Sequence, residues 1–477
     1  MLFNSFDFAV FLPIVFILYW FVFHKSIKAQ NLLLVVASYV FYGWWDWRFL
    51  FLILFSTLVD YTIGRALGTA QNIRSRKLLL GVSILVNIGL LGFFKYYNFF
   101  LDNFVEAFSF FGTSFEASRL DIILPVGISF YTFQTLSYTI DVYRKKLEPT
   151  KNLIAFTAFV SFFPQLVAGP IERATNLLPQ FFKKRNFNSD QAIIGIKQII
   201  WGLFKKNVIA DNCAQYVNEI FGNYDSLSSA TLLLGAVYFA FQIYGDFSGY
   251  SDIAIGTARL FNFKLMTNFR YPYFSRDIAE FWRRWHISLS TWFRDYVYIP
   301  LGGSRGSQLK QIRNVFIIFL VSGFWHGANW TFLVWGAINA LFFIPLLLAK
   351  RNRNHTDTVA QGRFLPSFRE GITMLGTFGI VTIGWIFFRA DSVAVATDYI
   401  KHLFQFSFGF VMLDIERYSF EIIPFIGILL LFEWFSRNEE FPLFSNRFAL
   451  LKVSLVLLLI LVFGSFSTIQ DFIYFQF

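Results

Sequence analysis

The segment FWRRWHISLSTWFRDYVYIPLG, residues 281–302, decides the fold, and a second segment, SGFWHGAN at residues 322–329, supports it. Each segment holds one of the chain's 5 histidines, His286 and His326, in text that is otherwise aromatic and apolar. A polar side chain is costly in such surroundings unless it has a partner or a function. The two histidines therefore favour a membrane protein that carries out chemistry over one that only spans the bilayer.

The composition around these segments is that of a membrane protein. Hydrophobic residues make up 56% of the 477 residues, and charged residues make up 15%, against roughly 25% in a typical soluble domain. Apolar runs recur along the chain, and we expect about ten or eleven true spans of roughly 20 residues each. The shorter runs are expected to be re-entrant or interfacial helices. The first apolar run has no small-residue cleavage site after it, so it is predicted to be a retained span.

The net charge of +11 does not indicate nucleic-acid binding, because the basic residues gather in short loops between apolar runs. This distribution is typical of cytoplasmic loops. We expect the basic clusters at residues 24–28, 74–77, 144–146, 183–185 and 351–353 to be cytoplasmic. The acidic stretches at residues 102–121 and 391–421 are expected on the opposite side of the membrane.

The single cysteine, Cys213, allows neither an intramolecular disulfide nor a multi-thiolate metal site. We expect no metal centre and no bound cofactor. One helical membrane domain is predicted over residues 1–477, with a catalytic core at about residues 124–345. Within that core, from residue 166 to residue 329, spans become short and glycine, proline and arginine accumulate. Irregular backbone at membrane depth is tolerated where it lines a cavity or is surrounded by protein.

His326 follows a short apolar run, residues 315–325, that begins after Arg313. A helix of this length rises about 16 Å, roughly half the hydrocarbon thickness, which places His326 near the middle of the membrane. Asn329 offers an amide close by. A histidine there suits general-base catalysis at neutral pH. The alternative is a histidine that is satisfied by a neighbour and serves packing.

His286 lies directly after an arginine pair, Arg283 and Arg284. On a helix, these arginines are i,i+3 and i,i+4 neighbours of Glu280. Arginines at a membrane face can bind the phosphates of a nucleotide-like donor. The alternative is that the Trp and Arg residues anchor the chain at the membrane interface.

Three acidic residues lie within apolar text. Asp246 and Asp252, in GDFSGYSD, are candidates for function; the alternative is a helix break in which they cap the next helix. Asp60 is expected at the end of its span, with its carboxylate reaching the interface.

These motifs resemble the membrane-bound O-acyltransferase superfamily, specifically its bacterial branch of alginate and peptidoglycan O-acetyltransferase membrane subunits. The resemblance covers nearly the whole chain. It rests on LPVGISF at 124–130, LVAGPIER at 166–173, YGDFSGYSD at 244–252, residues 281–303, FWHGANW at 324–330 and FIYFQF at 472–477.

The resemblance implies a ring of helices around a thin central tunnel, in which a cytoplasmic acyl donor meets an acceptor from the other side. The family's essential histidine falls on His326 and its second polar position falls on His286. His326 would act as general base on the acceptor hydroxyl, and His286 would orient that imidazole or polarise the thioester carbonyl. Arg283 and Arg284 would hold the donor's phosphates. The other expected substrate contacts are Trp285, Trp325 and Asn329.

The expected activity is O-acetyl transfer from a thioester, with acetyl-CoA as donor, toward an exported polysaccharide or cell-wall glycan. The acceptor would be reached directly or through a periplasmic SGNH-type acetyltransferase or esterase partner, from a bacterial cytoplasmic (inner) membrane in contact with its lipids. Two alternatives stay open: D-alanyl-type transfer from a carrier-protein thioester, and a transporter component without chemistry, which would favour inverted repeats.

Overall fold

The computed structural model describes residues 1–110, 118–167, 169–407, 409, 421–445, 448–466 and 472–473. These residues form α-helices joined by short 3-10 and π-helical turns, and none of them is in a strand. The chain forms two compact units, Met1–Gly195 with Ala254–Met266 and Ile196–Ile253 with Thr267–Phe477. The all-helical prediction is confirmed, while the single domain with its catalytic core at about 124–345 stays a prediction.

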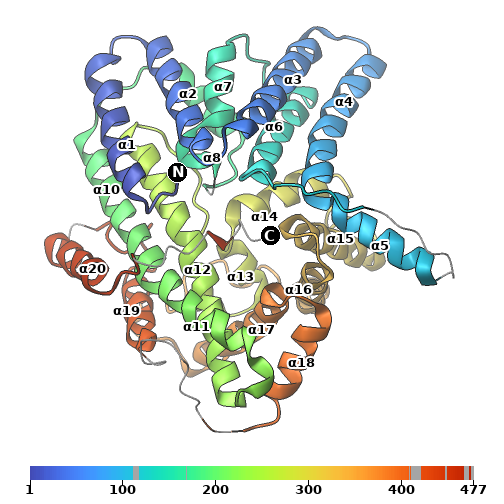
Figure 1. The fold of residues 1–477 in the computed structure, drawn as a ribbon, viewed down its shortest axis with the longest axis vertical. Helices are drawn as coiled ribbons and strands as arrows, with labels where there is room; N and C mark the ends of the chain where they lie inside the picture. The colour runs from blue at the N-terminus through green and yellow to red at the C-terminus, as the bar shows by residue number, and fades with distance from the viewer. Residues whose placement is uncertain are drawn as a thin grey trace. The chain divides into compact units, whose positions relative to one another are not determined.

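The first unit is built on N-terminal helices, of which α3, α4 and α6 pack against one another (Figure 1). Its elements are α1 Phe6–Ile17, η1 Leu18–Val22, α2 Ile27–Gly43, η2 Trp47–Phe49, α3 Leu50–Thr69, α4 Ile73–Leu91, η3 Gly92–Tyr96, α5 Tyr97–Phe110, α6 Ile128–Tyr143, α7 Leu153–Ser161, α8 Phe163–Leu166, α9 Ala174–Leu177 and η4 Leu178–Phe182.

Asp60 lies in the interior of α3, so the prediction that it ends its span is wrong. Its side chain is 0% exposed. Ser83 Oγ donates to one carboxylate oxygen at 2.6 Å and Asn87 Nδ2 to the other at 2.8 Å, both from α4. The neighbouring helix supplies the donors that water would otherwise supply, which is why the acid can stay inside the bundle.

The second unit holds both histidines of the quoted segments. Its elements are η5 Phe204–Ala210, α11 Asp211–Gly222, η6 Tyr224–Ser226, η7 Pro272–Phe274, α13 Ile278–Arg284, α14 Ile287–Phe293, η8 Arg294–Tyr298, α15 Gln308–His326, α16 Trp330–Leu348, α17 Phe368–Arg389, α18 Val393–Leu403, α19 Ile422–Phe435 and α20 Ala449–Phe463. Two helices, α10 (Ser189–Leu203) and α12 (Ser229–Leu260), continue from one unit into the other.

Asp246 and Asp252 lie within the continuous helix α12, so the alternative of a helix break in which they cap the next helix is wrong. Lys206 Nζ lies 2.8 Å from Asp246 and 2.7 Å from Asp211, and Lys205 Nζ lies 2.5 Å from Asp252. These lysines stand in η5, beside α12. Each acid of α12 is therefore paired with a cation, as buried charges must be.

Within the described residues, five helical segments are long and apolar enough to cross a membrane, and they support an integral multi-pass membrane protein. These are Trp47–Thr69, Ile73–Phe110, Ser229–Leu260, Trp330–Leu348 and Phe368–Arg389. Shorter apolar helical segments are Phe6–Val22, Leu153–Leu166, Ile422–Phe435 and Ala449–Phe463. Whether shorter segments bring the total to about ten or eleven stays a prediction.

Helices α15 and α16 approach each other backbone to backbone. A Cβ added to Gly323 would stand 2.2 Å from the carbonyl oxygen of Phe332, and one added to Gly336 would stand 2.5 Å from that of Phe319. Only glycine fits at such distances. This contact fixes the last turn of α15, which ends at His326.

Candidate active site

His286 occupies a tight turn between α13 and α14. Its backbone is left-handed, with φ 43 and ψ 54, a conformation that costs a residue with a side chain roughly 1–3 kcal/mol and persists where the surroundings impose it. The segment that contains Asn268 imposes it here. The Ile287 N–H donates to the Asn268 carbonyl at 2.9 Å, and the Arg270 N–H donates to the Arg284 carbonyl at 3.0 Å. A strained backbone conformation that the surrounding hydrogen bonds maintain is typical of functional positions.

The ring of His286 is 1% exposed and lies in an apolar cage. Its Nδ1 is 3.0 Å from Oδ1 of Asn268. Its Nε2 is buried and has no hydrogen-bond partner among the described residues. Phe247 packs edge-on at 4.5 Å between ring centroids, and Trp325 lies at 6.1 Å.

His326 ends α15 and is 3% exposed. Its ring centroid lies 4.9 Å from that of Trp325, 5.2 Å from that of Trp335 and 5.2 Å from that of Phe388. The Trp325 ring therefore lies near both imidazoles. The structure brings the two predicted histidines into one aromatic cluster.

A layer of indoles continues this cluster around the site. Trp385 of α17 lies 5.7 Å from Trp335 and 5.0 Å from Trp285, with all three rings buried. An environment of rings has a low dielectric, which strengthens any hydrogen bond or charge interaction that forms there. Trp285 and Trp325, both predicted substrate contacts, are part of this wall.

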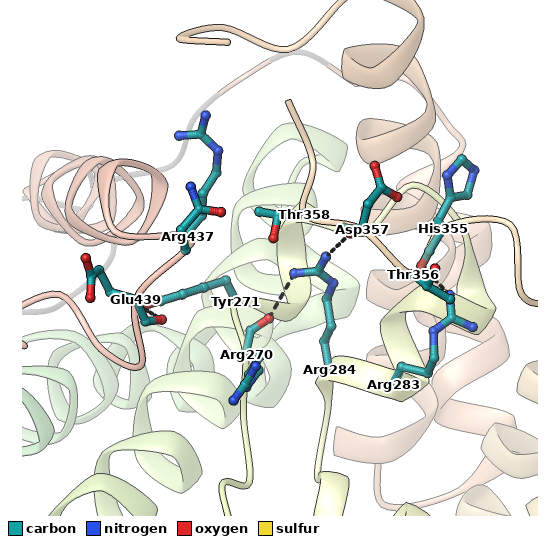
Figure 2. A pocket seen from close by; sticks show the side chains of 11 residues that line it. Arg270, Tyr271, Arg283, Arg284, His355, Thr356, Asp357, Thr358, Arg437 and Glu439 are labelled. Atoms are coloured by element: carbon teal, nitrogen blue, oxygen red, sulfur yellow. Dashed lines mark hydrogen bonds between the residues drawn. The ribbon is translucent and has the colours of Figure 1, made fainter. Parts of the chain in front are cut away.

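A polar cavity of about 270 Å³ opens beside α13. It is lined by Arg270, Tyr271, Arg283, Arg284, His355, Thr356, Asp357, Thr358, Arg437, Asn438 and Glu439. Figure 2 shows Arg284 between the Arg270 carbonyl and Asp357, with Arg437 and Glu439 on the other side. Both predicted arginines line this cavity, and its four arginines outnumber its two acids.

Arg284 and Arg283 are held in different ways. Arg284 donates to Glu280 at 2.8 Å, which confirms the predicted i,i+4 pair. Arg283 instead donates to the Asn352 and His355 carbonyls, both at 2.6 Å. Glu280 also pairs with Arg276 at 3.0 Å.

Arg276 ties α13 to the loop that covers the cavity. It donates to the Asp357 carboxylate at 2.9 Å and to its carbonyl at 3.1 Å. The hydrogen bond from this guanidinium holds the pKa of Asp357 below its usual range. The loop contact therefore stays ionised at neutral pH.

Asn329 serves a local purpose in the structure. Its Oδ1 accepts from the Thr331 N–H at 3.0 Å as the N-cap of α16, and its Nδ2 donates to the Asp391 carbonyl at 2.9 Å. Its side chain is thus engaged in helix capping, and its predicted substrate contact stays a prediction.

Sequence reasoning missed Asn268 and Arg276. Both are buried polar residues that lie outside the two quoted segments. Arg276 could have been found, because it stands four residues before Glu280 on the same stretch of chain. Asn268 carries no local signal, since its partners lie 17 to 20 positions away.

The sequence model described as the membrane-bound O-acyltransferase family matches residues 145–381. A probable alginate O-acetylase AlgI of Pseudomonas aeruginosa is 41% identical over 401 residues, which is 83% of this chain and 73% of the relative. The chain belongs to the membrane-bound O-acyltransferase family. This confirms the resemblance drawn from the motifs and makes the protein an acyltransferase.

Two further relatives of this acyltransferase carry different names. A peptidoglycan O-acetyltransferase of Helicobacter pylori is 37% identical over 431 residues, covering 84% of this chain and 79% of the relative. A teichoic acid D-alanyltransferase of Streptococcus thermophilus is 29% identical over 303 residues, covering 55% of this chain and 68% of the relative. The O-acetyl relatives therefore match more of the chain at higher identity.

Proposed function

We propose that this membrane O-acyltransferase moves an acetyl group from cytoplasmic acetyl-CoA toward an exported polysaccharide or cell-wall glycan. The acceptor is reached directly or through a periplasmic SGNH-type partner, from the bacterial inner membrane. The observation that carries the proposal is the pair of buried imidazoles, His286 and His326, that share Trp325 as a neighbouring ring. The names of the alginate and peptidoglycan relatives support acetyl as the group transferred.

In the proposed reaction, His326 takes the proton of the acceptor hydroxyl as its oxygen attacks the thioester carbonyl. The carbon–sulfur bond breaks, and the proton passes from the imidazole to the departing thiolate. Proton transfer by a positioned side chain typically contributes about 10²–10⁴-fold. The aromatic wall keeps the reacting groups aligned and limits competing water.

The cavity beside α13 suits the phosphate end of the donor. Arg283 and Arg284 end α13, two to three residues before the turn that holds His286, so only a short stretch of chain separates the cavity lining from His286. Guanidinium groups match phosphate oxygens in geometry and charge. We therefore assign the cavity to the donor's phosphates.

Replacing Arg283 with alanine is expected to raise KM for acetyl-CoA about 3- to 10-fold and leave kcat unchanged, because one phosphate contact at an exposed position is lost. The measurement is steady-state acetyl transfer by the purified protein in detergent. Arg351→Ala, in the same loop region but away from the cavity lining, is the matched control. An unchanged KM in Arg283→Ala would remove this arginine from the donor site.

The donor itself is tested with radiolabelled acetyl-CoA and the purified wild-type protein. We expect labelled acetyl groups to leave CoA and appear on a hydroxyl acceptor or water. The alternative, D-alanyl transfer from a carrier-protein thioester, is favoured by the teichoic acid relative. If the folded protein does not transfer acetyl groups from acetyl-CoA but does transfer acyl groups from such a carrier, the proposed donor is wrong and the alternative holds.

A further inference from the structure

Asn268 is a buried side chain, 1% exposed, whose hydrogen bonds can be assigned without ambiguity. The Ser288 backbone N–H lies 3.3 Å from the side-chain atom labelled Oδ1. A backbone N–H only donates, so that atom must be the amide oxygen. The amide nitrogen then donates to Ser251 Oγ at 3.1 Å on α12.

This assignment fixes the tautomer of His286. The Asn268 oxygen can only accept, so the His286 Nδ1, 3.0 Å away, must carry a hydrogen and donate it. In a neutral imidazole the other nitrogen is then bare. The Nε2 of His286 is therefore a buried acceptor, with no partner among the described residues.

We propose that Asn268 is a positioning residue of the acyltransferase, which holds His286 in the Nδ1–H tautomer so that Nε2 accepts a hydrogen bond during acyl transfer. A base oriented by a third group is a recurring catalytic arrangement. The proposal rests on the proposed function, because it assigns His286 to the reaction. Two roles were predicted for His286. The proposal keeps the first, orientation of the His326 imidazole, and leaves out the second, polarisation of the thioester carbonyl, because that role needs a hydrogen-bond donor.

The amide also explains why the third group is neutral. In the described part of the chain, the His286 ring has contacts with Phe247, Phe269, Trp325 and Asn268, and none of these four carries a titratable group. A carboxylate at position 268 would be a buried charge in this cage. An amide accepts the Nδ1–H without that cost.

The test compares Asn268→Leu, Asn268→Asp and His286→Ala in acetyl transfer from acetyl-CoA. Asn268→Leu is expected to lower kcat about 10- to 100-fold, with KM for acetyl-CoA within about threefold of wild type. Asn268→Asp restores an acceptor for Nδ1–H and should recover most of kcat at a pH where the imidazole is neutral. Its negative charge favours the imidazolium, so the acidic limb of kcat/KM should move to higher pH.

Asn212→Leu is the matched control, because Asn212 is also a buried asparagine of the same unit, 2% exposed and hydrogen-bonded to the Val208 and Phe463 carbonyls. It should lose stability while the folded protein keeps its kcat. The imidazole 15N signals of His286, in protein labelled at histidine, should show Nδ1–H in wild type and a change in Asn268→Leu.

The possible results separate the two levels of the argument. Loss of activity in His286→Ala beside a wild-type kcat in Asn268→Leu would overturn the role of Asn268 alone. A wild-type kcat in His286→Ala would overturn the role of His286 and the inference with it. In a third possible result, the wild-type protein shows the expected tautomer but does not use acetyl-CoA, and the variants show the same losses with a carrier-protein donor. That result would overturn acetyl-CoA as the donor and support the role of Asn268.

Discussion

In the His326→Ala variant, acetyl transfer is expected to fall by about 10²–10⁴-fold, because the group proposed to take the acceptor's proton is gone. The ring lies between Trp325, Trp335 and Phe388, and none of those rings can replace a base. The fall should be in kcat, since the proposed donor cavity beside α13 does not include His326. Steady-state transfer from radiolabelled acetyl-CoA in detergent measures it.

His24→Ala is the matched control for this experiment. His24 is an exposed histidine whose Nδ1 lies 3.2 Å from the Phe21 carbonyl oxygen, and the His24→Ala variant should retain wild-type transfer. The amount and unfolding temperature of each variant are measured first, so that a loss of folded protein is not read as a loss of catalysis. Folded His326→Ala protein with wild-type kcat would refute the assignment of the base.

The second large effect is on stability. In Lys206→Met, unfolding free energy is expected to fall by about 3–5 kcal/mol, because removing one partner of a buried ion pair strands the other. Lys206 is 1% exposed and lies 2.7 Å from Asp211 and 2.8 Å from Asp246, which are themselves buried. Asp246 also accepts a hydrogen bond from the Ile473 N–H at 2.6 Å. The contact of Ile473 with α12 should therefore weaken in Lys206→Met as well.

Unfolding in detergent, followed by temperature, tests this expectation against Lys401→Met, an exposed lysine of α18 that should change stability little. The triple variant Lys206→Met/Asp211→Asn/Asp246→Asn removes the stranded charges and should recover part of the loss. A Lys206→Met protein as stable as Lys401→Met would show that the lysine contributes nothing to the fold.

The sequence predicted the helical membrane fold and singled out His286 and His326, because apolar runs and histidines in aromatic text are local features; the joint role of the two histidines came from the family resemblance. Apolar runs give spans, and a histidine in aromatic text stands out at once. The end of α15 at His326 was also predictable, since glycine and asparagine follow it.

The parts that could not be predicted depend on partners distant in the chain. Asp60 was predicted to lie at the end of its helix. The donors that satisfy it inside the bundle, Ser83 and Asn87, belong to another helix, so the sequence around Asp60 does not reveal them. A helix break at Asp246 was left open as an alternative because Lys206, the lysine that pairs with it, lies 40 positions earlier. Asn268 has no local pattern at all. For Asp60 and Asp246 a polar residue in apolar text was visible, but its partner was not.

The aromatic rings around His326 affect what happens to a bound donor between turnovers. A thioester held beside a base is exposed to hydrolysis whenever water reaches the carbonyl, and each such event wastes a donor. Trp325, Trp335 and Phe388 pack around the imidazole of His326 and limit the room for water beside the proposed base. In the proposed mechanism, these aromatic rings set the ratio of acyl transfer to hydrolysis of the donor. The same rings make His326 stand out in the sequence.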